Sequence, residues 1–211
     1  MIRQQIKDVL FFFNRWACLP STWSARVRFA TPRHPEGHYL NLGCGATYVP
    51  GMINCDGNRF RKMDLWLDLR NRLPFKDRSV AFIWLSHTLE HLFPDEAIRL
   101  LGEIRRVLTD QGVARVAVPC MEHALKIARG EVEDHYPRSF KDPLGQAINH
   151  LFVDGQHKFG YSFSVMQDFC AQAGFTRVVN YSAEHQEQPK AYGHVTVGNE
   201  PKGSLVVELS R

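Results

Sequence analysis

The sequence predicts an α/β protein with a doubly wound, mostly parallel sheet of seven strands and helices on both faces. Two observations predict this fold class. Short apolar segments alternate with amphipathic helical segments between residues 38 and 209, and a glycine turn joins the first two apolar segments within residues 39–56, YLNLGCGATYVPGMINCD. Such alternation is typical of parallel sheets covered by helices. The 211 residues suffice for one domain with a full core.

The individual elements follow from apolar runs and from residues that begin or end helices. The first strand is an apolar run that stops at Gly43, and the clearest helix opens with Pro94 and Asp95 and keeps one apolar face. The expected strands are 38–42, 51–55, 64–67, 79–85, 113–118, 175–182 and 203–209, and the expected helices are 95–108, 120–129 and 163–173.

Residues 1–37 are predicted to form an amphipathic helix and a connector that precede the main domain, 38–211. Apolar residues recur at helical spacing within residues 2–16, where Arg3, Lys7 and Arg15 add positive charge. No run approaches the ~20 apolar residues of a membrane span, and a signal-peptide cleavage site is absent. The helix either packs on the domain or contacts an anionic membrane surface peripherally.

Residues 131–161 match neither the helical nor the strand period. The segment contains several prolines and glycines together with histidine, tyrosine and phenylalanine side chains. A structureless stretch of this length inside a compact domain is usually functional or disordered, and the aromatic content argues against disorder. We therefore expect a substrate lid above the carboxyl ends of the strands, where open α/β sheets bind ligands.

The glycine turn and the acid after the second strand are typical of a site for an adenosine-containing ligand. Glycines at 43 and 45 allow backbone N–H groups to approach a ligand closely, and Asp56 is placed to accept hydrogen bonds from ribose hydroxyls. Tyr48 stands where a dinucleotide site has its third glycine, so a pyrophosphate would fit poorly. Cys44 in the turn is interpreted as a packing residue, not a nucleophile.

Composition narrows the class of protein further. The net charge of +4 is too small to indicate nucleic-acid binding, and the five cysteines contain no CxxC pair that would indicate a zinc ribbon. A reducing cytoplasm is the simplest setting.

The segment from His87 to His91 also matches the HxxEH motif of a zinc peptidase, with Glu90 as the base. Pro94 leaves room for only about one helical turn, so we expect no metal there.

Four segments in order resemble a known family: LNLGCG, NCD, LDLRNRLPFKDRSVAFIWLSHTLEHL and LGEIRRVLTDQGVARVAVP. They resemble the class I S-adenosylmethionine-dependent methyltransferases, and most of all the small bacterial, type 11-like members with a short link to the acidic residue. The resemblance covers roughly residues 38–182. It implies a Rossmann-like sheet whose last strand is antiparallel and inserted next to the fifth, with S-adenosyl-L-methionine as cofactor.

The resemblance also assigns roles to residues. It implies that the turn Gly43-Cys44-Gly45 lies under the methionine part of the cofactor, Asp56 binds the ribose, Asp68 with Leu69 flanks adenine, and Ser86 with His87 lies beside the sulfonium. His87, His157 and Tyr161 are the candidate catalytic residues. A histidine base with a pKa near neutral suits the removal of an acceptor proton, although His157 could equally be a packed lid residue.

The predicted function is methyl transfer to an acceptor that the sequence does not identify. Members with these motifs often serve bacterial surface-polysaccharide pathways, so the resemblance implies a surface-polysaccharide or lipid-linked glycan acceptor at the inner membrane face. A small-molecule or RNA acceptor stays open. A non-catalytic scaffold is the alternative, because Ala81 replaces the family's usual aspartate and only 10 residues separate Gly45 from Asp56.

Overall fold

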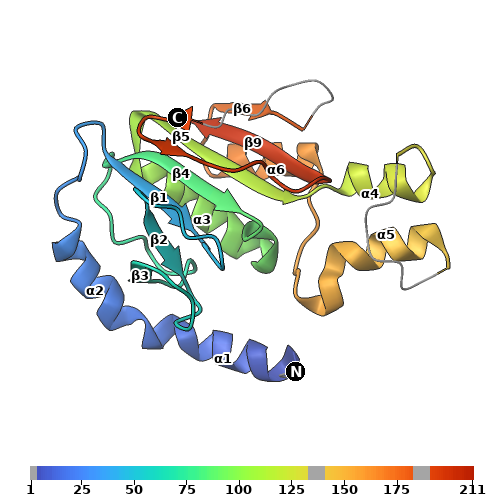
Figure 1. Cartoon of the computed structure of the whole chain (residues 1–211), viewed down its shortest axis with the longest axis horizontal. Coiled ribbons are helices and arrows are strands. Elements are labelled where there is room, and N and C mark those ends of the chain that lie inside the picture. The colour runs from blue at the N-terminus through green and yellow to red at the C-terminus, as the bar shows by residue number, and fades with distance from the viewer. Residues whose placement is uncertain (1–3, 133–140, 183–190) are drawn as a thin grey trace.

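The computed structural model describes residues 4–132, 141–182 and 191–211. It contains a seven-stranded sheet in the order β3-β2-β1-β4-β5-β9-β6 and a separate two-stranded hairpin, β7-β8 (Figure 1). The strands are β1 (His38–Leu42), β2 (Ile53–Asp56), β3 (Leu65–Trp66), β4 (Val80–Ser86), β5 (Leu108–Pro119), β6 (Arg177–Asn180), β7 (Ala191–Tyr192), β8 (Val195–Thr196) and β9 (Ser204–Ser210).

The pairing of the strands confirms the expected sheet. β1 to β5 pair in parallel, whereas β9 is antiparallel to both neighbours, β5 and β6. The chain order reverses between β1 and β4, so the carboxyl ends of these two strands meet at the point where open α/β sheets bind ligands. Gly43 follows β1 and His87 follows β4, so both candidate residues lie at this point.

The helices are α1 (Gln4–Ala17), α2 (Leu19–Arg28), α3 (Pro94–Val107), α4 (Met121–Ala128), α5 (Pro143–Phe152) and α6 (Phe163–Gln172), with short 3-10 segments η1 (Leu89–His91) and η2 (Val153–Gly155). In α3, Pro94 occupies the first turn and Glu96 accepts the Phe93 N–H at 3.1 Å. In α6, the Ser162 hydroxyl accepts the Val165 N–H at 3.2 Å. Both helices begin with side chains that satisfy free backbone donors.

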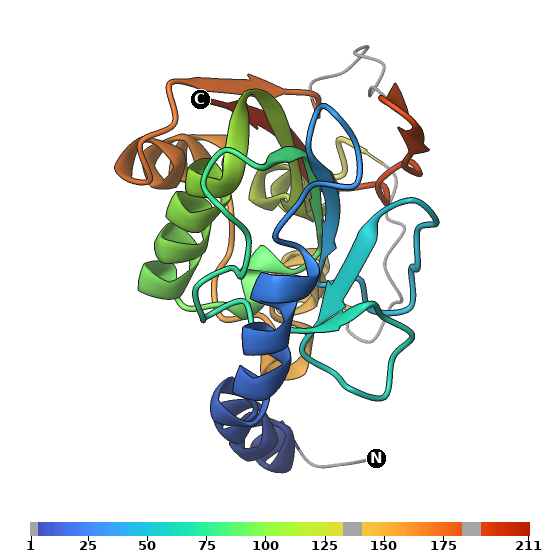
Figure 2. The same ribbon diagram turned by 90° about the vertical axis from the view of Figure 1, so that its left-hand side faces the viewer.

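One face of the sheet is covered by helices. Buried residues of α2, α3 and α6 form a single core with β-strand residues such as Leu40, Ile83 and Val207. Figure 2 shows α3 and α6 together on this side of the sheet. The buried side chains of α3 recur three and four residues apart, which is why its expected apolar face is also its packed face.

The other face of the sheet carries a second, smaller buried cluster. The buried cluster on the other face joins Tyr39, Phe82 and Trp84 to Met52 and to the β7-β8 region. The hairpin lies on this side of the sheet in Figure 2. Within the cluster, Tyr192 stacks on Phe82 with ring centroids 3.8 Å apart. The link between β1 and β2 forms no helix, and its residues Val49 and Met52 pack on this face directly.

Three elements differ from expectation. α5 lies inside the segment predicted to have no regular structure, and Asp142 caps it by accepting the Gly145 N–H at 2.5 Å. α2 is a full helix in the predicted connector, and β5 begins at Leu108 instead of residue 113. The signal for α5 was the Asp142-Pro143 pair, since an N-cap residue followed by proline at the first position favours a helix start.

Candidate functional site

The glycine turn and Asp56 face each other at the carboxyl ends of β1 and β2. Gly43 and Gly45 have φ angles of +68° and +52°, which side-chain-bearing residues rarely adopt. The Asp56 carboxylate accepts the Gly45 N–H at 2.7 Å and the Asn58 N–H at 2.6 Å. A Cβ on Gly43 would lie 2.2 Å from the Thr88 hydroxyl oxygen. The turn is therefore held between the acid after β2 and the segment after β4.

Cys44 packs inside this turn, as the sequence predicts. Its side chain is buried, and burial raises the pKa of the thiol to about 11. The thiolate is the nucleophilic form of cysteine. Cys44 therefore remains a neutral thiol at physiological pH and does not act as a nucleophile, while its backbone N–H donates to the Cys55 carbonyl at 3.0 Å.

Asp68 is the candidate adenine-side acid, and the structure places it under α1. It is buried, and Arg70 donates to both its oxygens, from Nε at 2.9 Å and from a terminal nitrogen at 2.6 Å. Asn14 of α1 reaches the same carboxylate at 3.4 Å and also accepts the Trp66 indole N–H at 3.0 Å. Leu69 beside it packs against the main core. The Asp68 carboxylate is thus already paired with Arg70, and its contact with adenine stays a prediction.

Ser86 and His87 end β4 as predicted, and Glu200 joins them. Glu200 is buried and accepts the Trp84 indole N–H at 2.6 Å and the Ser86 hydroxyl at 2.5 Å. It also lies 3.9 Å from the Arg115 guanidinium. Sequence reasoning missed Glu200, because it lies 114 residues from Ser86 and no local motif marks it.

His87 combines a strained backbone with a fixed ring. Its φ of +47° is uncommon for a residue other than glycine, although histidine adopts positive φ more often than most residues, and such conformations cluster at functional sites. The Nε2 atom lies 2.8 Å from the Ser204 hydroxyl and Nδ1 lies 3.5 Å from a Glu90 oxygen. Burial lowers the pKa of His87, but the Glu90 carboxylate outweighs burial and the net pKa is raised.

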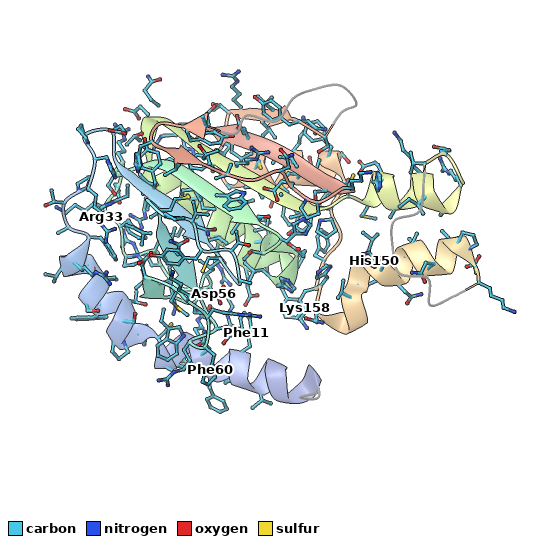
Figure 3. The ribbon with its side chains drawn as sticks, in the orientation of Figure 1. Phe11, Arg33, Asp56, Phe60, His150 and Lys158 are labelled. Atoms are coloured by element: carbon cyan, nitrogen blue, oxygen red, sulfur yellow. The ribbon has the colours of Figure 1, made fainter. Side chains whose placement is uncertain are left out.

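The predicted lid brings His157 to the same place. The backbone N–H of Lys158 donates to the Glu90 carbonyl at 2.7 Å, which docks this part of the lid on η1. The His157 Nε2 atom lies 3.9 Å from a Glu90 oxygen, and burial lowers the pKa of the imidazole. Figure 3 shows Lys158 and Asp56 at the same end of the sheet. Residues 133–140 of the predicted lid lie outside the described residues, and the assignment of 131–161 as a substrate lid stays a prediction.

One catalytic interpretation needs correction. Tyr161 was expected to contact the acceptor, but it is fully buried in the main core, with its hydroxyl 3.5 Å from the Leu89 carbonyl. It packs against Phe159 and Phe169 and is structural. The HxxEH segment forms only the three-residue η1, in agreement with the single short turn that the sequence predicts.

Comparison with known proteins agrees with this geometry. Residues 43–116 match the family described as the methyltransferase domain. The fold is similar to that of a SAM-dependent methyltransferase from Archaeoglobus fulgidus, at 13% identity and a TM-score of 0.52, over 90% of this chain and 92% of that one. It is also similar to a chain in the complex of the Haloferax volcanii Trm112 methyltransferase activator with a methyltransferase, at 15% identity and a TM-score of 0.51, over 100% and 97%.

These two structural likenesses concern the fold alone, and no curated protein matches the sequence. The family match begins at Gly43 and extends into β5, so it spans the glycine turn, Asp56, and the end of β4. The sheet order, with its antiparallel strand next to β5, agrees with that match. Over residues 43–116, the chain is therefore similar to a methyltransferase domain.

Proposed function

We propose that this enzyme transfers the methyl group of S-adenosylmethionine to a hydroxyl of a surface-polysaccharide precursor or lipid-linked glycan. The observation that supports the site of transfer is the juxtaposition of Asp56 and the glycine turn with His87 at the reversal between β1 and β4. The cofactor supplies an activated methyl group on its sulfonium. The protein's own residues hold the ribose, orient the acceptor and exclude water, which accelerates transfer mainly through positioning.

Asp56 is the residue whose replacement tests cofactor binding. Hydrogen bonds to a charged acceptor contribute about 1.5–3 kcal/mol each. We therefore expect Asp56→Ala to weaken S-adenosylmethionine binding at least tenfold in titration calorimetry, with a matching loss of S-adenosylhomocysteine release. Asp110→Asn is the control, since Asp110 is an exposed surface carboxylate far from the turn. Equal affinity in the Asp56 variant and the parent chain would remove Asp56 from the site.

The N-terminal helices support the proposal of a membrane-associated acceptor. Exposed aromatic side chains gather on α1, α2 and the loop after β2, including Trp16 at 64%, Trp23 at 70% and Phe60 at 90% exposure. Figure 3 shows Phe11 and Phe60 on the side of the molecule that α1 borders. Arg15, Arg26 and Arg28 lie on the same two helices. Among the described residues, no helix is long and apolar enough to cross a membrane.

Helices that carry exposed aromatic and basic residues suit peripheral binding to anionic lipid. We expect the chain to co-sediment with phosphatidylglycerol vesicles and to bind them less in high salt, because salt screens the charge attraction. The double variant Phe12→Ser, Trp16→Ser should lose most of this binding. Phe93→Ser removes a similarly exposed aromatic side chain outside these helices and should bind like the parent. Retention of binding by the double variant would rule out this face as the membrane contact.

A further inference from the structure

Glu90 is a buried carboxylate without the partners that burial normally requires. Its side chain is 1% exposed, and neither carboxylate oxygen accepts a hydrogen bond from any residue that the structure describes. Buried carboxylates are ordinarily paired, hydrogen-bonded or bound to a metal, since an isolated one is strongly unfavourable. The nearest charged candidate is His87, whose Nδ1 atom is 3.5 Å away. That distance is longer than a charge-assisted hydrogen bond of about 2.7–2.9 Å, so Glu90 remains incompletely paired.

Two further histidines surround the same carboxylate. One nitrogen of His91, one nitrogen of His157 and one oxygen of Glu90 all lie within 4.8 Å of one another. The two rings are 4.8 Å apart at their centroids and nearly perpendicular. Tetrahedral ligands at Zn–N and Zn–O distances of about 2.1 Å lie about 3.4 Å apart. The three side chains therefore need only a small inward movement to reach a common ion.

One nitrogen of each imidazole is fixed by the backbone. The His91 Nδ1 atom lies 3.1 Å from the Gln156 carbonyl oxygen, and the His157 Nδ1 atom lies 2.5 Å from the Leu151 carbonyl oxygen. A carbonyl can only accept, so each Nδ1 donates its proton and each Nε2 keeps a lone pair. Metal-binding histidines are oriented in this way by hydrogen bonds from the nitrogen that does not bind the metal.

We propose that Glu90, His91 and His157 bind one divalent transition-metal ion on the acceptor side of the methyl-donor pocket. Two imidazoles and a carboxylate suit Zn²⁺ or a similar ion and leave a coordination position for an oxygen ligand. The Thr88 hydroxyl, between His87 and η1, lies 3.4 Å from the Gly43 carbonyl oxygen, so the ion would lie next to the glycine turn.

The role of this ion rests on the proposed function, whereas its binding does not. A bound ion makes an acceptor hydroxyl more acidic. The hydroxyl proton passes to water, the resulting oxygen forms a bond to the methyl carbon, the carbon–sulfur bond breaks, and its electron pair remains on sulfur. The substrate class that follows is a hydroxyl acceptor able to coordinate a metal ion, as the hydroxyls of a sugar can.

Metal binding is tested on the full chain after dialysis against a chelator. We expect Zn²⁺ titration calorimetry to give one tight site per chain, and Co²⁺ to give the visible absorption of a four- or five-coordinate ion. His91→Ala, His157→Ala and Glu90→Gln should each weaken binding at least tenfold. Circular dichroism identifies any variant that does not fold, and His91→Ala, whose side chain is only half-buried, remains informative if the Glu90 variant unfolds.

A second cluster of possible ligands, His34, Glu36 and His194, provides the matched control. His194→Ala should leave the tight site unchanged. Absence of stoichiometric Co²⁺ binding by the parent chain would overturn the proposal, as would loss of the site in His194→Ala with retention in His91→Ala. Asp56→Ala should lose S-adenosylmethionine binding while keeping the Co²⁺ spectrum. If the parent chain binds Co²⁺ but not S-adenosylmethionine, the proposed function fails and the metal site stands.

Discussion

His157 and Tyr161 lie four residues apart in the HKFGYS segment, yet they have different roles. His157 reaches Glu90 at the carboxyl end of the sheet, whereas the Tyr161 ring lies in the core and its backbone carbonyl accepts the Met121 N–H at 3.0 Å. Burial raises the pKa of the Tyr161 hydroxyl far above its ordinary value. The hydroxyl therefore stays protonated and serves as a weak donor to Leu89 instead of taking part in proton transfer.

Two replacements of Tyr161 separate the contribution of its hydroxyl from that of its ring. Tyr161→Phe removes one long hydrogen bond, so it should lower the free energy of unfolding by about 1 kcal/mol and leave turnover nearly unchanged. Tyr161→Ala removes the whole ring and should cost about 3–5 kcal/mol. Urea unfolding and S-adenosylhomocysteine release measure the two effects. A large loss of turnover in a stably folded Tyr161→Phe variant would restore the tyrosine to the catalytic site.

At the scale of elements, α2 has one face in the core and one face in solvent. Thr22 and Ala25 are buried, and Phe29 at its C-cap packs against Phe75 with ring centroids 5.7 Å apart. Trp23 and Val27 project outward from the same helix. The sequence of this segment, with its prolines nearby, led us to expect a connector. The tertiary contact with Phe75 is not visible in a local pattern, which is why the helix was missed.

The two faces of α2 should respond differently to loss of an aromatic ring. Phe29→Ala leaves a cavity in the core and should lower the free energy of unfolding by about 3–5 kcal/mol. Trp23→Ala removes a larger ring from the surface and should change the free energy of unfolding by about 0.5 kcal/mol or less. Denaturant unfolding of both variants checks this. Similar costs for the two would mean that α2 does not pack on the domain as described.

At the scale of the whole molecule, all five cysteines are free thiols in buried positions. Burial raises the pKa of every one of them above the ordinary value of 9.0. An unfolded chain releases these protons near pH 9, while the folded chain retains them to higher pH. The folded state therefore binds more protons in this range, and the free energy of unfolding must fall as the pH rises above about 9.

This linkage predicts a decline in stability between pH 8 and pH 10, measured by urea unfolding in the presence of a reductant. Cys120→Ala removes one contributing thiol, whose pKa is raised to about 11, and should make the decline shallower. Thiol-specific reagents should react slowly with the folded chain at pH 8, because only the thiolate is nucleophilic. A free energy of unfolding that is constant or rises over this interval would contradict the burial of these thiols.

The sequence predicts the parts of the fold that local patterns encode. The β1 turn, Asp56 and α3 follow from glycines, apolar runs and helix-start residues within a few positions of one another. The insertion of β9 followed from the family resemblance and is confirmed. Glu200 and the β7-β8 hairpin could not be predicted in this way, because both depend on contacts with β4 from over a hundred residues away, such as Tyr192 on Phe82.

The position of β9 has a consequence for the order of assembly during synthesis. β9 follows β6 in the chain but lies between β5 and β6 in the sheet. The main-chain groups by which β6 joins the sheet are paired with β9 alone. A nascent chain that has just released β6 from the ribosome therefore carries a strand with no partner, while β1 to β5 can already pair. The β5 edge also stays open until β9 emerges, so this is the interval in which an unfinished chain is most exposed to pairing with another.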